Sequence, residues 1–341
     1  MQTLTRAHDE LYRRTPDEQF PNLDALVQHC QTQKEASQEQ WHAPHTIRPE
    51  STGGELTLRL DQEGVYGLND WSFTQVCGLA KVSKDTVNKL RPQTADAVLA
   101  ETLPSGTRPI QTLIQGDQVR SIHGASYTRL YNADLLGVVN EFASHFSAPQ
   151  EAVGGASGLY CGEQDMFCFL IDPTGWAEID GEAFAPGFFL WNSEVGKRSI
   201  GIQTFWFQAI CRNHIVWDAV EVVEFTRNHT ARVYESLDGI RRIIENLVYK
   251  VDARRDGFIH VIEKAMRKRL GSDAEEVLKA LHKHGIPRNL AQEAMKMAKA
   301  QGEFTLFALI DALTRMAGKI PNAGDRIELD TKAAGLLALA A

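Results

Sequence analysis

The stretch Phe188–Thr230, near the middle of the 341-residue chain, most constrains its fold. It contains three apolar runs, Phe188–Trp191, Ile200–Cys211 and Ile215–Phe225, and a turn-rich segment, NSEVGKRS, separates the first two. Phe, Trp, Ile and Val favour the pleated, half-buried surface of a strand, whereas Gly, Asn and Ser favour turns. The stretch therefore predicts antiparallel strands joined by hairpins.

Polar side chains gather where these predicted strands end. Loops on a rigid scaffold often carry function, so we expect any site of the sheet to lie at this rim. The alternative is an ordinary solvated edge, in which Asn192, Glu194 and Gly196 form a hairpin turn and Cys211 belongs to the core. The candidates for nucleic-acid contact at the rim are Lys197, Arg198, Arg212, Arg227 and His229.

Three segments of this stretch, WNSEVG at 191–196, CRNH at 211–214 and TRNHT at 226–230, resemble the core of the domain-of-unknown-function 932 family. Members of that family are also called phage/plasmid-like proteins and occur on plasmids, prophages and other mobile elements. Arg120 with YTRLYN at 127–132 also matches the family pattern, and LFALIDALTRMA at 306–317 resembles its C-terminal helix. The resemblance implies a cytoplasmic accessory protein of a mobile element and specifies no reaction.

Charge is unevenly distributed along the chain, whose formal net charge is −8. Residues 131–226 hold 3 Lys and Arg against 13 Asp and Glu, whereas residues 227–299 hold 16 against 10. Because neutralisation of phosphates drives nucleic-acid binding, we expect such contacts on the basic segment or in a local basic groove. The acidic sheet region is a poor candidate for a broad DNA platform.

Residues 68–91 predict two short helices with the spacing of a helix-turn-helix unit. Apolar residues recur at helical intervals from Phe73 to Leu90, and Ser83 is a good N-cap for the second helix. Lys81 stands where many such units have Gly at the tight turn. The alternative is a packing unit without DNA contact. On the first interpretation the second helix offers Lys84, Lys89 and Arg91 as phosphate contacts.

The segment 127–132, YTRLYN, has one arginine between two tyrosines. Tyr127 and Tyr131 could stack on a base while Arg129 contacts a phosphate. Alternatively, both tyrosines are half-buried at a strand end. A helix is expected from about Asn132 to His145, because apolar residues recur there at helical spacing.

The two ends of the chain are expected to be mainly helical. Leu23–Gln38 predicts one helix, followed by a linker in which the side chains of His42 and His45 are solvated. Beyond residue 230 apolar positions recur at steps of three and four, which is typical of amphipathic helices. Shorter helices are expected at 273–284, 287–300 and 305–317, and an Ala/Leu-rich helix at 331–341 could be a packing or oligomer contact.

Composition and motif spacing limit the kinds of site that the chain is expected to form. Five cysteines without a CxxC pair indicate reduced thiols in a cytosolic protein, and neither a secretory signal nor a membrane-spanning run is present. The Gly-rich segment 154–158 has no phosphate-loop spacing, and no zinc spacing occurs. Acidic residues at 163–194 could bind a divalent cation through oxygen ligands, but their spacing is not specific to a metal site and favours solvated loop acids.

Together these features predict an α+β fold with a central antiparallel sheet. The predicted regions are an N-terminal helix and linker (1–54), a strand with a helix-turn-helix-like module (55–102), a β-rich domain (103–230) and a helical region (231–341). We expect a non-catalytic nucleic-acid-associated protein without cofactors, for example one that binds or anneals single-stranded DNA, with homo-oligomers as an option. The alternatives are a metal-dependent enzyme acting on nucleic acid or nucleotides, and a module that contacts a host protein.

Overall fold

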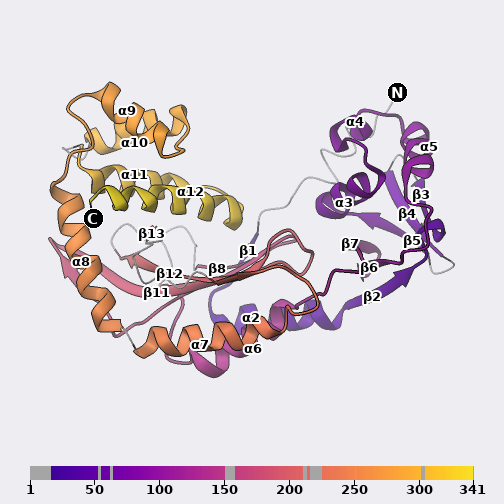
Figure 1. The fold of residues 1–341 in the computed structure, drawn as a ribbon, viewed down its shortest axis with the longest axis horizontal. Helices are drawn as coiled ribbons and strands as arrows, with labels where there is room; N and C mark the ends of the chain where they lie inside the picture. Colours follow the sequence, from indigo (N-terminus) through magenta and orange to yellow (C-terminus); the bar gives the residue numbers. More distant parts are fainter. Residues whose placement is uncertain are drawn as a thin grey trace.

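Two β-sheets and their helices build the molecule. The computed structural model describes residues 17–52, 55–61, 64–149, 158–209, 213–215, 225–249, 251–300 and 304–340. The smaller sheet and its helices form one end of the molecule, and the larger sheet, with helices on both faces, forms the rest (Figure 1). Runs of strands and runs of helices follow one another along the chain, so the fold is α+β, as the sequence predicted.

The smaller sheet lies in the N-terminal part of the chain. Its elements are β2 (Ser37–His42), η1 (Pro44–Thr46), β3 (Ile47–Thr52), β4 (Glu55–Leu60), β5 (Gly64–Leu68), α3 (Asp70–Ala80), α4 (Lys84–Asn88), α5 (Pro92–Thr102), β6 (Ile110–Gln115) and β7 (Gln118–Gly124). The strand order is β2-β6-β7-β5-β4-β3, and only β5 and β7 are parallel among the described neighbours. Leu56, Leu58 and Leu60 point into a core that α3 and α5 cover, which confirms the predicted alternation in β4.

The larger sheet is antiparallel throughout its described pairings. Its strands are β1 (Glu18–Gln19), β8 (Leu159–Cys161), β9 (Met166–Ile171), β10 (Ala177–Ile179), β11 (Glu182–Asn192), β12 (Ile200–Gln208), β13 (Asn213–Ile215) and β14 (Phe225–Arg227). The predicted hairpin is present, because β11 and β12 pair from Phe184–Gln208 to Trp191–Gly201. Most of the third predicted run, Ile215–Phe225, and Cys211 with it, lies outside the described residues.

Helices cover both faces of the larger sheet. On one face pack α2 (Leu23–Glu35), α6 (Asn132–Phe142) and α7 (Glu235–Tyr249). On the other face pack α8 (Val251–Arg267), α9 (Ala274–Lys283), α10 (Arg288–Ala300), α11 (Leu306–Ala317), α12 (Ala323–Gly335) and η2 (Leu336–Leu339) (Figure 1). In β9 the side chains of Phe167 and Phe169 belong to the core on the side of α8–α12. Those of Cys168 and Leu170 belong to the core on the side of α2, α6 and α7. Burial on both faces explains why this strand is apolar at every position.

Two strands occupy the segment that was predicted to be a linker. β2 has the polar sequence SQEQWH and no apolar alternation, and it pairs along its whole length with β6. His42, expected in solvent, is buried: its Nδ1 lies 2.9 Å from Asp61 Oδ2 and its Nε2 lies 2.9 Å from Thr112 Oγ1. That expectation was wrong because one of these partners is 70 residues away in the sequence.

The remaining strands and the chain ends show the same non-local pairing. β6 and β7 fall within the predicted β-rich region 103–230, yet they pair with strands of the N-terminal part rather than with the larger sheet. Asp17, next to β1, accepts a hydrogen bond from the backbone nitrogen of Ala323 at 2.6 Å, which ties the first described residue to the start of α12. None of the described helices has the length and apolarity needed to span a membrane.

Candidate functional site

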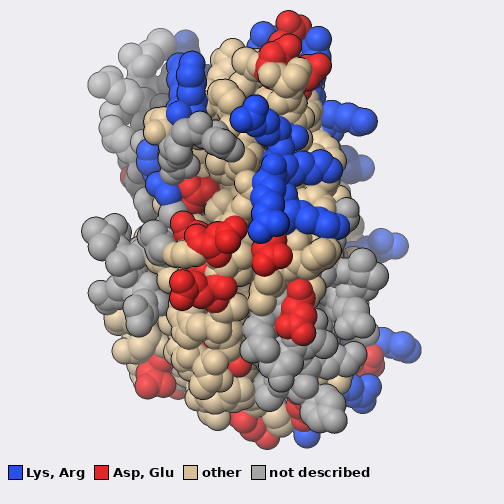
Figure 2. Space-filling model, turned by 90° about the vertical axis from the view of Figure 1, so that its left-hand side faces the viewer, with Lys and Arg blue, Asp and Glu red and all other residues tan. Residues whose placement is uncertain are grey.

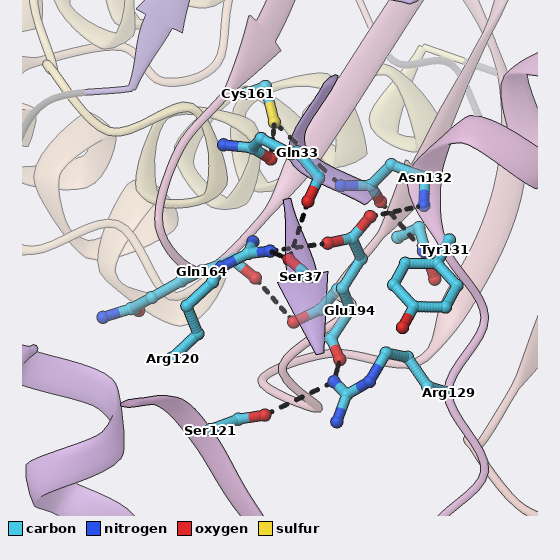
Figure 3. A network of polar contacts seen from close by, with 12 residues as sticks. Gln33, Ser37, Arg120, Ser121, Arg129, Tyr131, Asn132, Cys161, Gln164 and Glu194 are labelled. Carbon is cyan, nitrogen blue, oxygen red and sulfur yellow. Dashed lines mark hydrogen bonds and ion pairs between the residues drawn. The ribbon is translucent and has the colours of Figure 1, made fainter. Parts of the chain in front are cut away.

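The turn between β11 and β12 carries an acidic residue into the joint between the two sheets. Glu194 is 2% exposed, and its Oε2 accepts a hydrogen bond from Arg120 Nη1 at 3.1 Å (Figure 3). Its Oε1 accepts one from the backbone nitrogen of Asn132 at 2.8 Å. Asn132 is the first residue of α6, where the unpaired N–H groups and the helix dipole favour a carboxylate. Glu194 therefore caps a helix as well as pairing with a buried arginine.

A second buried arginine completes this joint. Arg129 is 3% exposed; its Nε lies 2.7 Å from Glu39 Oε1, and its Nη1 donates to the backbone carbonyl of Glu194. The same guanidinium contacts Ser121 Oγ at 3.3 Å, and Arg120 Nη1 reaches Ser37 Oγ at 3.2 Å. A buried charge is tolerated only when it is paired and hydrogen-bonded, which both guanidinium groups are here. They join β2 and β7 of the smaller sheet to the larger one.

Three aromatic rings stack beside Arg129. The ring of Tyr127 lies 3.6 Å from that of His123 and 5.4 Å from that of His229, and both pairs are stacked. The hydroxyl of Tyr127 donates to the carbonyl of Glu194 at 2.8 Å. Burial lowers the pKa of His123 to about 3 and that of His229 to about 4. Both imidazoles are therefore neutral at neutral pH.

A glycine makes this stack possible. Gly196 has a φ of +75°, and a Cβ there would lie 2.6 Å from His123 Cε1 and 2.9 Å from Tyr127 Cε2. Any larger residue would be strained in its backbone and would also clash with the rings. Next to it, Trp71 Nε1 donates to the carbonyl of Val195 at 2.6 Å, so α3 also holds the turn. The predicted hairpin turn is confirmed, and it is an inter-sheet contact as well.

The structure places the ten sequence-predicted contact residues in different environments. Tyr127, Arg129 and His229 meet in the joint, but they are wholly or partly buried, and Arg129 is already paired. In the β11–β12 turn Arg198 pairs with Asp165 at 3.2 Å, and Lys197 is exposed, its Nζ 4.8 Å from the ring centroid of Trp71. This rim therefore presents one exposed cation among its described side chains.

The remaining predicted contacts do not join that rim. Lys84 forms an ion pair with Asp70, and α4, on which it lies, is only 5 residues long. Lys89 and Arg91 are exposed on the linker between α4 and α5. Arg212 lies outside the described residues, and for Arg227 the structure describes the backbone, in β14, and not the side chain.

The thiol of the joint is not poised for nucleophilic chemistry. A hydrogen bond with Cys30 and burial hold the pKa of the Cys161 thiol well above its ordinary value, so the thiol stays protonated. A nucleophilic cysteine needs the thiolate, and a depressed rather than a raised pKa. Within the described parts of the chain, no three His, Cys, Asp or Glu side chains are placed to share a metal ion.

Exposed cations are concentrated on the C-terminal helices instead. The segment 258–300 holds nine Lys and Arg against five Asp and Glu. Figure 2, which faces this end of the molecule, shows Lys and Arg side chains gathered in its upper half. Six exposed side chains at the end of α8 and in the second half of α10 are called the basic surface below. They are Lys264, Arg267, Lys268, Arg269, Lys296 and Lys299.

Short contacts join the end of α8 to the start of α11, the helix that follows α10. The backbone nitrogen of Leu306 donates to the carbonyl of Lys268 at 2.7 Å, and Arg269 pairs with Thr305 in an isolated bridge. The end of α8 therefore lies next to the segment that follows α10. The sequence located the excess of basic residues but not this non-local contact.

Comparisons with models of protein families, with curated proteins and with solved structures find no match for this chain. A proposal for its function therefore depends on the geometry of the molecule. The molecule offers two features: a joint of ion pairs and hydrogen bonds that links the two sheets, and exposed cations on the C-terminal helices.

Proposed function

We propose that this chain binds nucleic acid without catalysis, through the basic surface. The observation that carries the proposal is the exposure of all six cations of that surface, at the end of α8 and in the second half of α10. Within the described residues, no carboxylate lies within ion-pair distance of Lys264, Arg267, Lys296 or Lys299. Cations without an internal acidic partner can neutralise phosphates and release counterions, which is the main driving force of non-specific nucleic-acid binding.

The alternative location, the rim of the larger sheet, is less suitable. Arg129 and Arg198 are engaged by Glu39 and Asp165, and His229 is buried and neutral. Moving Arg198 to a phosphate would break its ion pair with the buried carboxylate of Asp165, and breaking a buried pair costs several kcal/mol. The proposal therefore assigns phosphate contact to the helices and structural roles to the polar residues of the joint.

The resemblance to the phage/plasmid-like family adds a biological context to this proposal. It rests on the segments 191–196, 211–214 and 226–230, and the first of them forms the end of β11 and the turn that carries Glu194 and Gly196. Residues that build the joint between the sheets would keep a fold intact whatever ligand the protein binds. A nucleic-acid-binding accessory protein of a mobile element is consistent with both observations.

The test is a titration of fluorescently labelled single-stranded DNA, duplex DNA and RNA at several salt concentrations. For four phosphate contacts, affinity should fall about a hundredfold between about 50 and about 200 mM salt. The double variant Arg267→Gln/Lys296→Gln should lower the slope of the log–log salt plot by about 2. Lys89→Gln/Arg91→Gln is the matched control, because it also removes one exposed Lys and one exposed Arg, at the other end of the molecule.

The outcomes are distinct. If the control pair lowers the slope and the Arg267/Lys296 pair does not, the N-terminal module and not the basic surface contacts the phosphates. Absence of binding to all three probes at low salt would refute the proposal. Hydrolysis of a probe that depends on added Mg²⁺ or Mn²⁺ would favour the metal-dependent enzyme instead.

A further inference from the structure

The helices α9 and α10 form a hairpin with the features of a helix-turn-helix unit. The turn between them, residues 284–287, contains Gly285 at a φ of +77° and the fully buried Ile286. Short turns of three or four residues with a Gly are typical of such units. Leu281 of α9 and Ala291 of α10 are also fully buried. Unlike α4, the second helix here has 13 residues, enough to lie along a groove.

The outward face of α10 is polar over its whole length. Its buried residues, Ala291, Ala294, Met295 and Ala298, lie on one side of the helix and pack into the core. On the opposite side a stripe runs at steps of four, four and three residues, flanked by two further exposed polar residues. The stripe is Arg288, Gln292, Lys296 and Lys299, and the flanking residues are Asn289 and Glu293.

The order of residue types along this face matches what a base-reading helix needs. Arg288, Asn289 and Gln292 lie in the first turns, where a recognition helix contacts base edges in the major groove. Arginine pairs with the two acceptors of guanine, and Asn and Gln pair with the donor and acceptor of adenine. Lys296 and Lys299 lie nearer the end of α10 and belong to the basic surface, which suits them to phosphates.

The surface around α10 favours a duplex over a single strand. Sequence-tolerant binding of single strands depends on exposed aromatic rings on which bases stack. The exposed large apolar residues of the described chain are Trp41, Val65, Trp176 and Tyr234, all of which precede the C-terminal helices. A helix with Arg, Asn and Gln and without a stacking platform fits the major groove of B-form DNA.

We propose that α9–α10 is a helix-turn-helix unit that reads duplex DNA through Arg288, Asn289 and Gln292, with the basic surface on the flanking phosphates. This inference rests on the proposed function, and it adds duplex DNA as the ligand and sequence readout as the mode of binding.

The experiment is selection of bound sequences by the full-length chain from a duplex pool with a randomised centre. The selected sequence is then titrated against a scrambled duplex and against its own single strand. The wild-type chain should prefer the selected duplex, and each base contact should contribute about 5- to 150-fold of that preference. Asn289→Ala and Gln292→Ala should lose preference while keeping their affinity for the scrambled duplex and its salt dependence.

Lys299→Ala is the matched control on the same exposed face, and it should weaken binding to selected and scrambled duplexes by the same factor. Circular dichroism and melting temperature verify that each variant is folded. Salt-dependent binding without a selected sequence, or a preference that survives both Asn289→Ala and Gln292→Ala, would overturn the inference and leave the proposed function standing. Absence of binding to any nucleic acid would overturn both.

Discussion

The two stacked imidazoles beside Tyr127 make the joint sensitive to acid. Burial lowers the pKa values of His123 and His229 to about 3 and about 4, whereas the same groups titrate near 6.5 in an unfolded chain. Between about pH 4 and pH 6.5 the unfolded state therefore binds more protons than the folded state. The free energy of unfolding is then greatest above pH 6.5 and falls as the pH decreases.

We expect the free energy of unfolding to drop by up to about 1.4 kcal/mol per pH unit for each histidine in this window. Burial raises the pKa of Asp330 to about 7, which gives a contribution of the opposite sign from about pH 4 to pH 7 and reduces the net slope. In His229→Phe the slope should decrease, because the ring is kept and the titrating group is lost. Urea unfolding at a series of pH values measures it.

The control for this experiment is His45→Phe, because His45 is exposed and lies outside the ring stack. Its slope should equal that of the wild-type chain. An unchanged slope in His229→Phe would show that the buried ring does not account for the acid sensitivity.

At the scale of the element, α3 ends with a lysine at a position where glycine is preferred. Lys81 ends α3 in the left-handed conformation, with a φ of +56°. A residue with a Cβ is disfavoured there by about 1 to 2 kcal/mol, whereas Gly is not. The sequence pointed to this position, because Lys81 stands where Gly is common in such turns. The structure shows that the left-handed turn forms without it.

Lys81→Gly should therefore raise the free energy of unfolding by about 0.5 to 1 kcal/mol, since the greater entropy of Gly in the unfolded chain offsets part of the gain. Gly285→Ala provides the reverse test. At its φ of +77° an added Cβ meets no atom within 4 Å, so the only new effect is backbone strain. This strain should lower the free energy of unfolding by about 1 kcal/mol. Denaturant midpoints measure both changes, and equal signs for the two variants would contradict this account.

Sequence analysis identifies elements with a strong local signal. The helices α9, α10 and α11, the strand β9 and the β11–β12 hairpin follow from periodicity, caps and turn residues within a few positions. β2 and β3 lack such a signal, because their stability comes from pairing with strands that follow later in the chain. The helix or strand that carries a polar residue was therefore easier to predict than the residue with which it forms a hydrogen bond or an ion pair.

The candidate site shows the same limit at the scale of the whole molecule. Arg120, Asn132 and Glu194 lie up to 74 residues apart, and no spacing in the sequence indicates that they meet around one carboxylate. Arg129 and His229, predicted as nucleic-acid contacts, lie in the joint between the two sheets. The basic character of 227–299 was visible in the sequence, but the contact between the end of α8 and the start of α11 was not.

Glu194→Gln tests this coupling between the two sheets. It should leave Arg120 buried with a neutral partner and lower the free energy of unfolding by about 3 to 5 kcal/mol. Because Glu194 joins the sheets, the smaller sheet should then unfold before the larger one, and hydrogen exchange should rise in β5 and β7 before it rises in β9 and β11. Denaturant unfolding with hydrogen exchange and mass spectrometry measures both.

Glu50→Gln is the control, because Glu50 pairs with Arg59 at 2.9 Å on the surface, with both side chains more than 40% exposed. Exposed pairs contribute about 0 to 1 kcal/mol, so this variant should unfold like the wild-type chain. A Glu194→Gln chain that unfolds in one transition with wild-type stability would show that the sheets are held together by other contacts.

The tie between Asp17 and Ala323 has a consequence for biosynthesis. The two residues are 306 positions apart, so a ribosome that adds about 5 to 20 residues per second needs about 15 to 60 s to make the second after the first. During that interval α12 has not yet been made, so Asp17 cannot accept a hydrogen bond from its first residue. The hydrogen bond that Asp17 accepts can therefore form only after α12 has been made, whereas β1 can pair with β8 earlier.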